Sequence, residues 1–244
     1  MKKKLLAIFL LVSSLIFSED RVLSFEQITL DEKNELIYAI GEKTPYTGIV
    51  EDYKFFIENR FLEGRAIFKN GLMEGTFKVL YPNGKIARIM IYKNGKTEGI
   101  QKVYYESGII KRETSHKNGL VDGLMKSYYP NGNIQSEVLV KKDVRDGITR
   151  TYDPNGKLKV EVSYQNGVQV GVQKGYYPSG KLKIELPLDK NGLTNGIVKI
   201  YYPSGKIMSE KSYKDDKLEG TVKIYDESGK IISEEFFKNG NRIK

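Results

Sequence analysis

From residue 75 onward, short apolar runs alternate with glycine-containing turns along the chain. Residues 76–81 form a run rich in β-branched and aromatic side chains, and the turn Pro82-Asn83-Gly84 follows it. Residues 86–92 form a second such run, which ends at the turn Asn94-Gly95. Runs of this composition are typical of β-strands, and proline, asparagine and glycine suit the backbone angles of tight turns. The pattern therefore predicts a β-hairpin.

The hairpin pattern occurs seven times with a period of 24 residues. Each unit opens on a glycine, which we number position 0, and one step of 25 residues indicates an insertion near residues 186–189. A fixed period of this kind predicts a repeat array in which each unit contacts mainly its neighbours. The opening glycines are Gly75, Gly99, Gly123, Gly147, Gly171, Gly196 and Gly220.

The connections between strands are too short to contain a helix, so consecutive strands should be antiparallel neighbours. The predicted fold is all-β, an elongated antiparallel β-meander of repeated 24-residue hairpins. Seven units in residues 75–244 would form a sheet roughly 65 Å long at ~4.8 Å per strand. A degenerate unit at residues 44–74 extends the array to residues 44–244, and residues 19–43 are expected to cap its N-terminal end.

Two hairpin registers compete. A three-residue loop with a bulge would place the tyrosine of position 5 opposite the isoleucine or leucine of position 11. A two-residue loop would instead pair the base of position 3 with the glutamate of position 14, for example Lys102 with Glu113. We expect the first register, because an exposed ion pair contributes only about 0.2–1 kcal/mol and buried apolar side chains contribute more.

The residues at positions 5 and 6 also assign the two faces of the sheet. Adjacent residues of a strand point to opposite faces, so positions 5 and 6 cannot share one. Position 6 is usually tyrosine but is Asp153 or Asp226 in two units, and an isolated aspartate is costly to bury. We therefore expect position 5 on the packed face and position 6 on the wetter face.

The N-terminus has the pattern of a secretory signal peptide. Three lysines at residues 2–4 precede an apolar run over residues 5–17, and polar residues follow Ser18. The apolar run is shorter than the roughly 20 residues that span a bilayer. We therefore expect residues 1–18 to be a signal peptide cleaved near Ser18, and the mature protein to be exported to the periplasm, the cell surface or the medium.

Composition excludes several kinds of chemistry. The chain has 40 Lys and Arg against 31 Asp and Glu, but these charges are interspersed at repeating positions instead of forming the basic stripe of a nucleic-acid-binding protein. One histidine and no cysteine exclude a Cys/His zinc site and a histidine-based triad. His116 occupies an otherwise mostly aromatic position, and Asp215-Asp216 falls at a turn without the spacing of a calcium loop. We expect neither an enzyme nor a bound metal or cofactor.

The repeated phrase carries a resemblance to known proteins. Tyr-Tyr-Pro-Asn-Gly-Lys-Ile, then Glu, then Tyr-Lys-Asn-Gly and a closing Gly resembles the MORN-repeat variant. Residues 36–48 are similar to the opening of the YwqK-family toxin–antitoxin antitoxins. The first resemblance implies a non-enzymatic scaffold that contacts proteins or membrane lipids, and the second implies a toxin partner.

Three functions follow as hypotheses. The first is an exported, non-enzymatic scaffold that binds a protein or an envelope surface, because broad repeated faces rich in tyrosine supply contact area at low entropic cost. The second is an antitoxin or immunity protein. The third is binding of carbohydrate or cell wall through tyrosines at position 6. The candidate interaction surface comprises Tyr81, Tyr105, Tyr129, Tyr177 and Tyr202.

Overall fold

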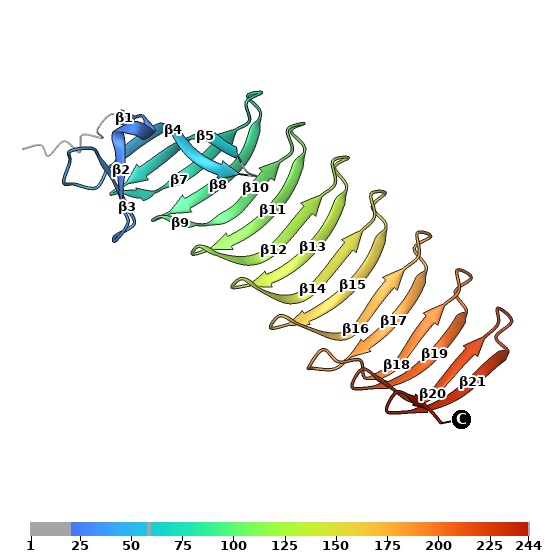
Figure 1. Cartoon of the computed structure of the whole chain (residues 1–244). Coiled ribbons are helices and arrows are strands. Elements are labelled where there is room, and N and C mark those ends of the chain that lie inside the picture. The colour runs from blue at the N-terminus through green and yellow to red at the C-terminus, as the bar shows by residue number, and fades with distance from the viewer. Residues whose placement is uncertain (1–20, 58–59, 244) are drawn as a thin grey trace, which may run out of the picture.

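The computed structural model describes residues 21–57 and 60–243. These residues form one long, narrow sheet of 20 strands and a separate two-stranded sheet at its N-terminal end (Figure 1). The predicted signal peptide at residues 1–18 lies outside the described residues. The prediction of an all-β array of hairpins is confirmed.

The N-terminal elements include two long strands. They are β1 (Val22–Leu23), the 3₁₀ helix η1 (Phe25–Gln27), β2 (Ile28–Asp31), β3 (Leu36–Ala39), β4 (Gly48–Ile57), β5 (Arg60–Lys69) and β6 (Leu72–Met73). The ten-residue strands β4 and β5 form the degenerate hairpin. β1 pairs with β4 in parallel, so the sheet is mixed at this end instead of being a pure meander.

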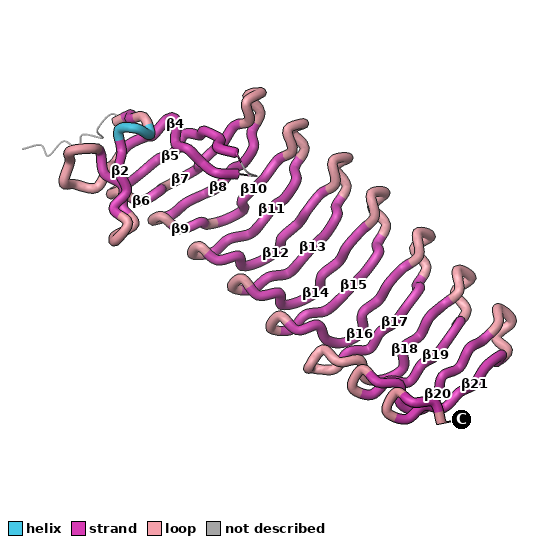
Figure 2. The backbone as a smooth tube through the Cα atoms, in the orientation of Figure 1, coloured by secondary structure: helices cyan, strands magenta, loops and turns pink. Residues whose placement is uncertain are grey.

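The seven repeats supply the remaining strands in chain order. They are β7 (Gly75–Leu80), β8 (Ile86–Lys93), β9 (Lys96–Thr97), β10 (Gly99–Tyr104), β11 (Ile110–Lys117), β12 (Leu120–Tyr128), β13 (Ile134–Lys141), β14 (Val144–Tyr152), β15 (Leu158–Gln165), β16 (Val168–Tyr176), β17 (Leu182–Leu188), β18 (Gly196–Tyr201), β19 (Ile207–Lys214), β20 (Lys217–Tyr225), β21 (Ile231–Lys238) and β22 (Asn241–Arg242). Figure 2 shows them as a single layer with turns along both long sides.

The two kinds of turn differ in geometry. At one side the loop has three residues: the Gly108 amide donates to the Tyr105 carbonyl at 2.8 Å, and the Tyr105 amide donates to the Ile109 carbonyl at 2.8 Å. At the other side the loop has two residues, and Asn118 and Gly119 have φ of 52° and 89°. Positive φ at both residues defines the type I′ turn, which matches the twist of the strands it joins.

The 25-residue unit differs only at its second turn. The Gly192 amide donates to the Asp189 carbonyl at 3.1 Å, and the Asp189 amide donates to the Leu193 carbonyl at 2.9 Å. This turn is a three-residue loop of residues 190–192, so the extra residue lies just after the stretch predicted for the insertion, residues 186–189. The following strand is not shifted, because Glu185 still pairs with Lys199.

Both candidate registers occur in the hairpin of each of the seven repeats, which corrects the expectation that they exclude each other. In β10–β11, Tyr104 pairs with Ile110, and Lys102 pairs with Glu113. A bulge at position 12, which is Lys111 in this hairpin, separates the two pairs. Because a bulge places one extra residue on one strand, positions 3, 5, 11 and 14 all point to the same face, which we call the ladder face.

The prediction of which face is packed is wrong. The buried aliphatic and aromatic side chains of the repeats lie mainly at positions 2, 4 and 15, on the face opposite the ladder face. These include Phe77, Val79, Met90, Val138, Val162, Val198 and Val222. Among the described residues, no buried hydrophobic side chain occupies position 5 or 11. Position 5 carries a hydroxyl group that needs a partner, and this partner lies on the ladder face.

The N-terminal end holds the main hydrophobic core. Ile37 and Ala39 of β3 pack with Phe77 and Val79 of β7, and Tyr46 joins the same cluster. β3 therefore packs against the first strands, while the capping role of residues 19–43 stays a prediction.

Candidate protein-binding face

The five tyrosines predicted as an interaction surface connect adjacent repeats. Each lies at position 6, and its hydroxyl group donates to the main-chain carbonyl of position 5 in the next unit. The pairs are Tyr81 to Tyr104 (2.6 Å), Tyr105 to Tyr128 (2.7 Å), Tyr129 to Tyr152 (2.9 Å), Tyr177 to Tyr201 (2.6 Å) and Tyr202 to Tyr225 (2.7 Å). These hydroxyl groups are already used in holding the array together.

Position 6 is not the wetter position. Tyr81 is only 8% exposed and its four counterparts are half-buried. Where position 6 is aspartate, the side chain turns to its own loop: Asp153 Oδ1 accepts the amides of Asn155 and Lys157, both at 2.9 Å. The aspartate therefore replaces the tyrosine without being buried unpaired. Binding of a ligand by these tyrosines stays a prediction.

Positions 3 and 14 form an unbroken row of alternating charges across the ladder face, which we call the charge ladder. Each of the first five glutamates pairs in the sheet with a base of its own hairpin and with a base of the next hairpin, and Glu234 pairs with Lys223 of its own hairpin. The rungs in order are Lys102, Glu113, Lys126, Glu137, Arg150, Glu161, Lys174, Glu185, Lys199, Glu210, Lys223 and Glu234.

Ion pairs within the hairpins are formed along the ladder. The shortest joins Arg150 Nε to Glu161 Oε2 at 2.7 Å, and Lys102 Nζ lies 3.2 Å from Glu113 Oε1. These side chains are between a fifth and two fifths exposed. Pairs this accessible contribute little free energy individually, so the ladder sets the charge pattern of the surface more than it stabilises the fold.

The tyrosines of position 5 also contact the ladder. Tyr128 donates its hydroxyl hydrogen to Glu113 Oε2 at 2.7 Å, and Tyr201 donates to Glu185 Oε2 at 2.7 Å. Burial and this bond to a carboxylate raise the pKa of Tyr128 to about 12, and the same causes act on Tyr201. The bond from Tyr128, together with Lys102, lowers the pKa of Glu113. Each such tyrosine thus fixes a glutamate of the preceding hairpin in place.

A row of exposed aliphatic side chains runs beside the charge ladder on the same face. We call it the hydrophobic row; its members occupy position 1 or 16, one in each of the first six repeats. They are Ile91, Ile100, Leu139, Ile148, Val172 and Ile197, each between 39% and 50% exposed. The sequence analysis missed this row, although the aliphatic residue directly after the opening glycine of several units was a visible signal.

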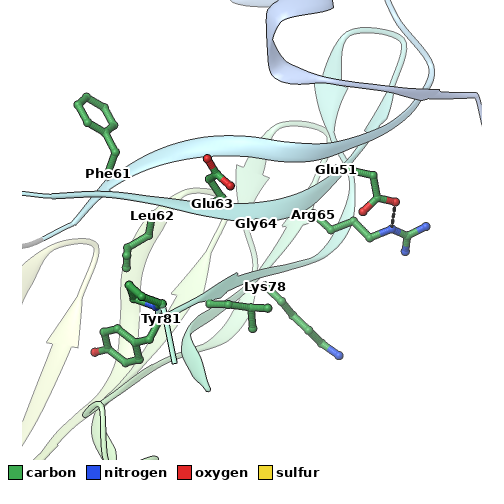
Figure 3. A pocket seen from close by; sticks show the side chains of 10 residues that line it. Glu51, Phe61, Leu62, Glu63, Gly64, Arg65, Lys78 and Tyr81 are labelled. Atoms are coloured by element: carbon green, nitrogen blue, oxygen red, sulfur yellow. Dashed lines mark hydrogen bonds and ion pairs between the residues drawn. The ribbon is translucent and has the colours of Figure 1, made fainter. Parts of the chain in front are cut away.

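The first repeat interrupts the pattern of the ladder face. Leu80 replaces the tyrosine of position 5, and Ile89 replaces the glutamate of position 14, so Lys78 lies between Arg65 and Ile89 in the sheet. β5 and β7 pair only near Gly64, and where they separate an open depression of about 650 Å³ forms. Figure 3 shows the ion pair of Arg65 with Glu51 (3.1 Å) and the side chain of Phe61, which is 71% exposed.

The residues considered for catalysis or metal binding have structural contacts. His116 Nδ1 lies 3.1 Å from the carbonyl oxygen of Thr114, two residues away. Asp215 and Asp216 have φ of 48° and 64° and form a type I′ turn. Within the described residues, no group of three or more histidine, aspartate or glutamate side chains is placed to hold a metal ion, and no helix has the length and apolar character needed to cross a membrane.

Comparison with known protein families agrees with the repeat boundaries. The model described as MORN repeat variant matches residues 73–94, 97–118, 121–142, 145–166, 169–190, 194–215 and 218–239. The comparison with curated proteins gave no match. The similarity of residues 36–48 to YwqK-family antitoxins lies outside the matched stretches and stays a prediction. Because the seven matches cover more than half of the chain, this protein belongs to the MORN repeat variant family.

Proposed function

We propose that this chain is an exported, non-enzymatic scaffold that binds another protein through its ladder face. The observation that carries the proposal is the hydrophobic row, in which six aliphatic side chains are two fifths to one half exposed at equivalent sites along one face. Single exposed aliphatic residues are common, but aligned ones rimmed by polar groups are typical of interaction sites.

The composition of the ladder face also favours a protein partner. Aliphatic side chains, tyrosines and paired charges lie in parallel rows, so a partner would bury apolar area and meet charges of both signs. The hydroxyl hydrogens of the position 6 tyrosines are donated to main-chain carbonyls, so they are not offered to a sugar. The ladder face, and not this column, is therefore the proposed surface.

Photo-crosslinking in the native cell tests the proposed surface. A photoreactive amino acid would replace Ile100, Ile148 or Ile197 in turn; the matched controls would be Gln135 and Lys159, which are exposed at position 12. Adducts of one defined mass at the row positions and none at the controls would support the proposal. Equal labelling at the row positions and the control positions, or no adducts at either, would refute the proposed surface.

Export is tested separately. Intact mass measurement of the protein recovered from the envelope or the medium should show a chain that begins near Glu19. A full-length chain found in the cytoplasm would contradict export but would leave the binding face in place.

A further inference from the structure

The ladder face is complementary to itself when it is reversed end for end. The charge ladder begins with a base, Lys102, ends with an acid, Glu234, and alternates at each rung between them. Reversal therefore brings each base onto an acid. The same reversal brings each position 5 tyrosine of β10 to β21 onto the isoleucine or leucine of position 11, because these also alternate from strand to strand.

We propose that the partner of the ladder face is a second copy of this chain, packed face to face with the two arrays running in opposite directions. This inference rests on the function proposed above, since it names the protein that the face binds. A two-fold axis parallel to the strands, between β15 and β16, places β10 over β21 of the second copy and β13 over β18. Such an interface is isologous and closed, as most homodimers are.

Five of the six members of the hydrophobic row are covered in this arrangement; Ile91 of β8 lies outside the twelve strands. Leu139 of β13 lies over Ile197 of the second copy, and Ile100 of β10 lies over Phe236. Ile148 of β14 meets Pro187 of β17. These three contacts remove apolar surface from water, whereas Val172 of β16 meets Ser163 of β15.

The charges and the size of the face agree with a dimer. Glu137 faces Lys199 of the second copy, and Arg150 faces Glu185. The twelve strands from β10 to β21 at ~4.8 Å spacing, with about 20 Å of strand length, give a footprint of about 1,100 Å² on each copy. The total of about 2,200 Å² reaches the lower end of the range of obligate homodimers. Stacked sheets lie about 10 Å apart, a gap that lysine, arginine and tyrosine side chains fill.

A double-substitution cycle tests the register. Glu137→Lys and Lys199→Glu each set like charges against each other across the interface. Each should therefore raise the dissociation constant of the dimer by about 10- to 100-fold. The double variant restores opposite charges and should return to within about threefold of the parent. Within one chain the two sites are five strands apart, about 24 Å, so their effects on unfolding should add.

The matched control is Glu137→Lys combined with Lys223→Glu. The register places Lys223 over Glu113 of the second copy, so residues 137 and 223 do not meet across the interface. The two substitutions should therefore weaken the dimer additively. Dissociation constants would come from sedimentation equilibrium, and circular dichroism would confirm that each variant is folded. A monomeric parent protein, or equal rescue by both double variants, would overturn the inference.

A second measurement does not depend on charge. The chain has no cysteine, so Leu139→Cys and Ile197→Cys variants can be mixed and treated with a short thiol-specific crosslinker. Crosslinked dimers are expected from this mixture, and not from Leu139→Cys mixed with Ile100→Cys. The reverse result would overturn the register. If the protein is monomeric but the hydrophobic row still labels a different protein in cells, the dimer is refuted and the proposed function stands. If there is neither a dimer nor a labelled partner protein, both the dimer and the proposed function are refuted.

Discussion

Replacing Tyr105 by phenylalanine removes a single hydroxyl group from the junction between two repeats. That hydroxyl donates to the Tyr128 carbonyl at 2.7 Å, and the ring around it is half-buried. A hydrogen bond of this kind contributes about 1 kcal/mol to stability. Because phenylalanine keeps the shape of the ring, no cavity is added to this cost. We therefore expect Tyr105→Phe to lower the free energy of unfolding by about 1 kcal/mol.

The five bridging tyrosines should have a large combined effect. They connect different pairs of repeats, so their contributions should add to about 5 kcal/mol when all five are phenylalanine. Typical domains are stable by only 5–15 kcal/mol, so this variant should unfold at markedly lower denaturant concentration. In contrast, Asp153→Tyr gains a bridge but loses two amide contacts of its loop, and its net effect should be small.

Urea unfolding followed by far-ultraviolet circular dichroism measures these changes. The control is Tyr213→Phe, because Tyr213 is also half-buried and its hydroxyl has no hydrogen-bond partner in the described part of the chain. An equal loss of stability in Tyr105→Phe and Tyr213→Phe would refute the bridging role of position 6. Equal stability of the parent and the fivefold variant would refute it as well.

Three further predictions concern single residues. Gly147→Ala should cost about 1 kcal/mol more than Gly171→Ala in thermal unfolding: both glycines have positive φ, but a Cβ at Gly147 would lie 2.9 Å from Leu139 Cδ1, whereas nothing lies within 4 Å at Gly171. Because the pKa of Tyr128 is raised to about 12, its protonated hydroxyl stabilises the fold fully at pH values below 10.0, the ordinary pKa. This contribution is lost as the pH rises through 12. Tyrosinate absorbance should therefore show one late-titrating group fewer in Tyr128→Phe than in the parent, while Tyr201, whose pKa is also raised to about 12, still titrates late. The lowered pKa of Glu113 stabilises the fold above the ordinary value of 4.5, and this contribution is lost as the pH falls through the lowered value; Glu113→Gln should show a shallower loss of stability on acidification, measured by circular dichroism.

The hairpins and their period could be predicted because each turn has a local chemical signature. Pro-Asn-Gly and Asn-Gly define two loop types, and the glycines confirm them with positive φ. The combined register could not be predicted, because it depends on a β-bulge at position 12. Lys111 and Lys159 give no sign that they are bulged, since a bulge is a property of two strands together and not of one residue.

The faces were predicted wrongly for a related reason. The assignment rested on the cost of burying Asp153, but that carboxylate accepts amide hydrogens from its own loop. The position 5 tyrosine was expected in a core, but its hydroxyl reaches a glutamate of the preceding hairpin, as in Tyr152 with Glu137 at 2.8 Å. The aspartate is satisfied within its own turn, whereas the tyrosines of positions 5 and 6 bond to neighbouring repeats, and these contacts cannot be read from one unit of sequence.

The extra residue near Asn191 leaves the following strand in register, because the turn absorbs it. Length differences at the edges therefore do not disturb the faces, and whole units can be gained or lost by duplication or deletion of gene segments. Each added unit extends the array by two strand spacings, or about 10 Å. The number of copies therefore acts as a ruler that sets the reach of the protein independently of its surface chemistry.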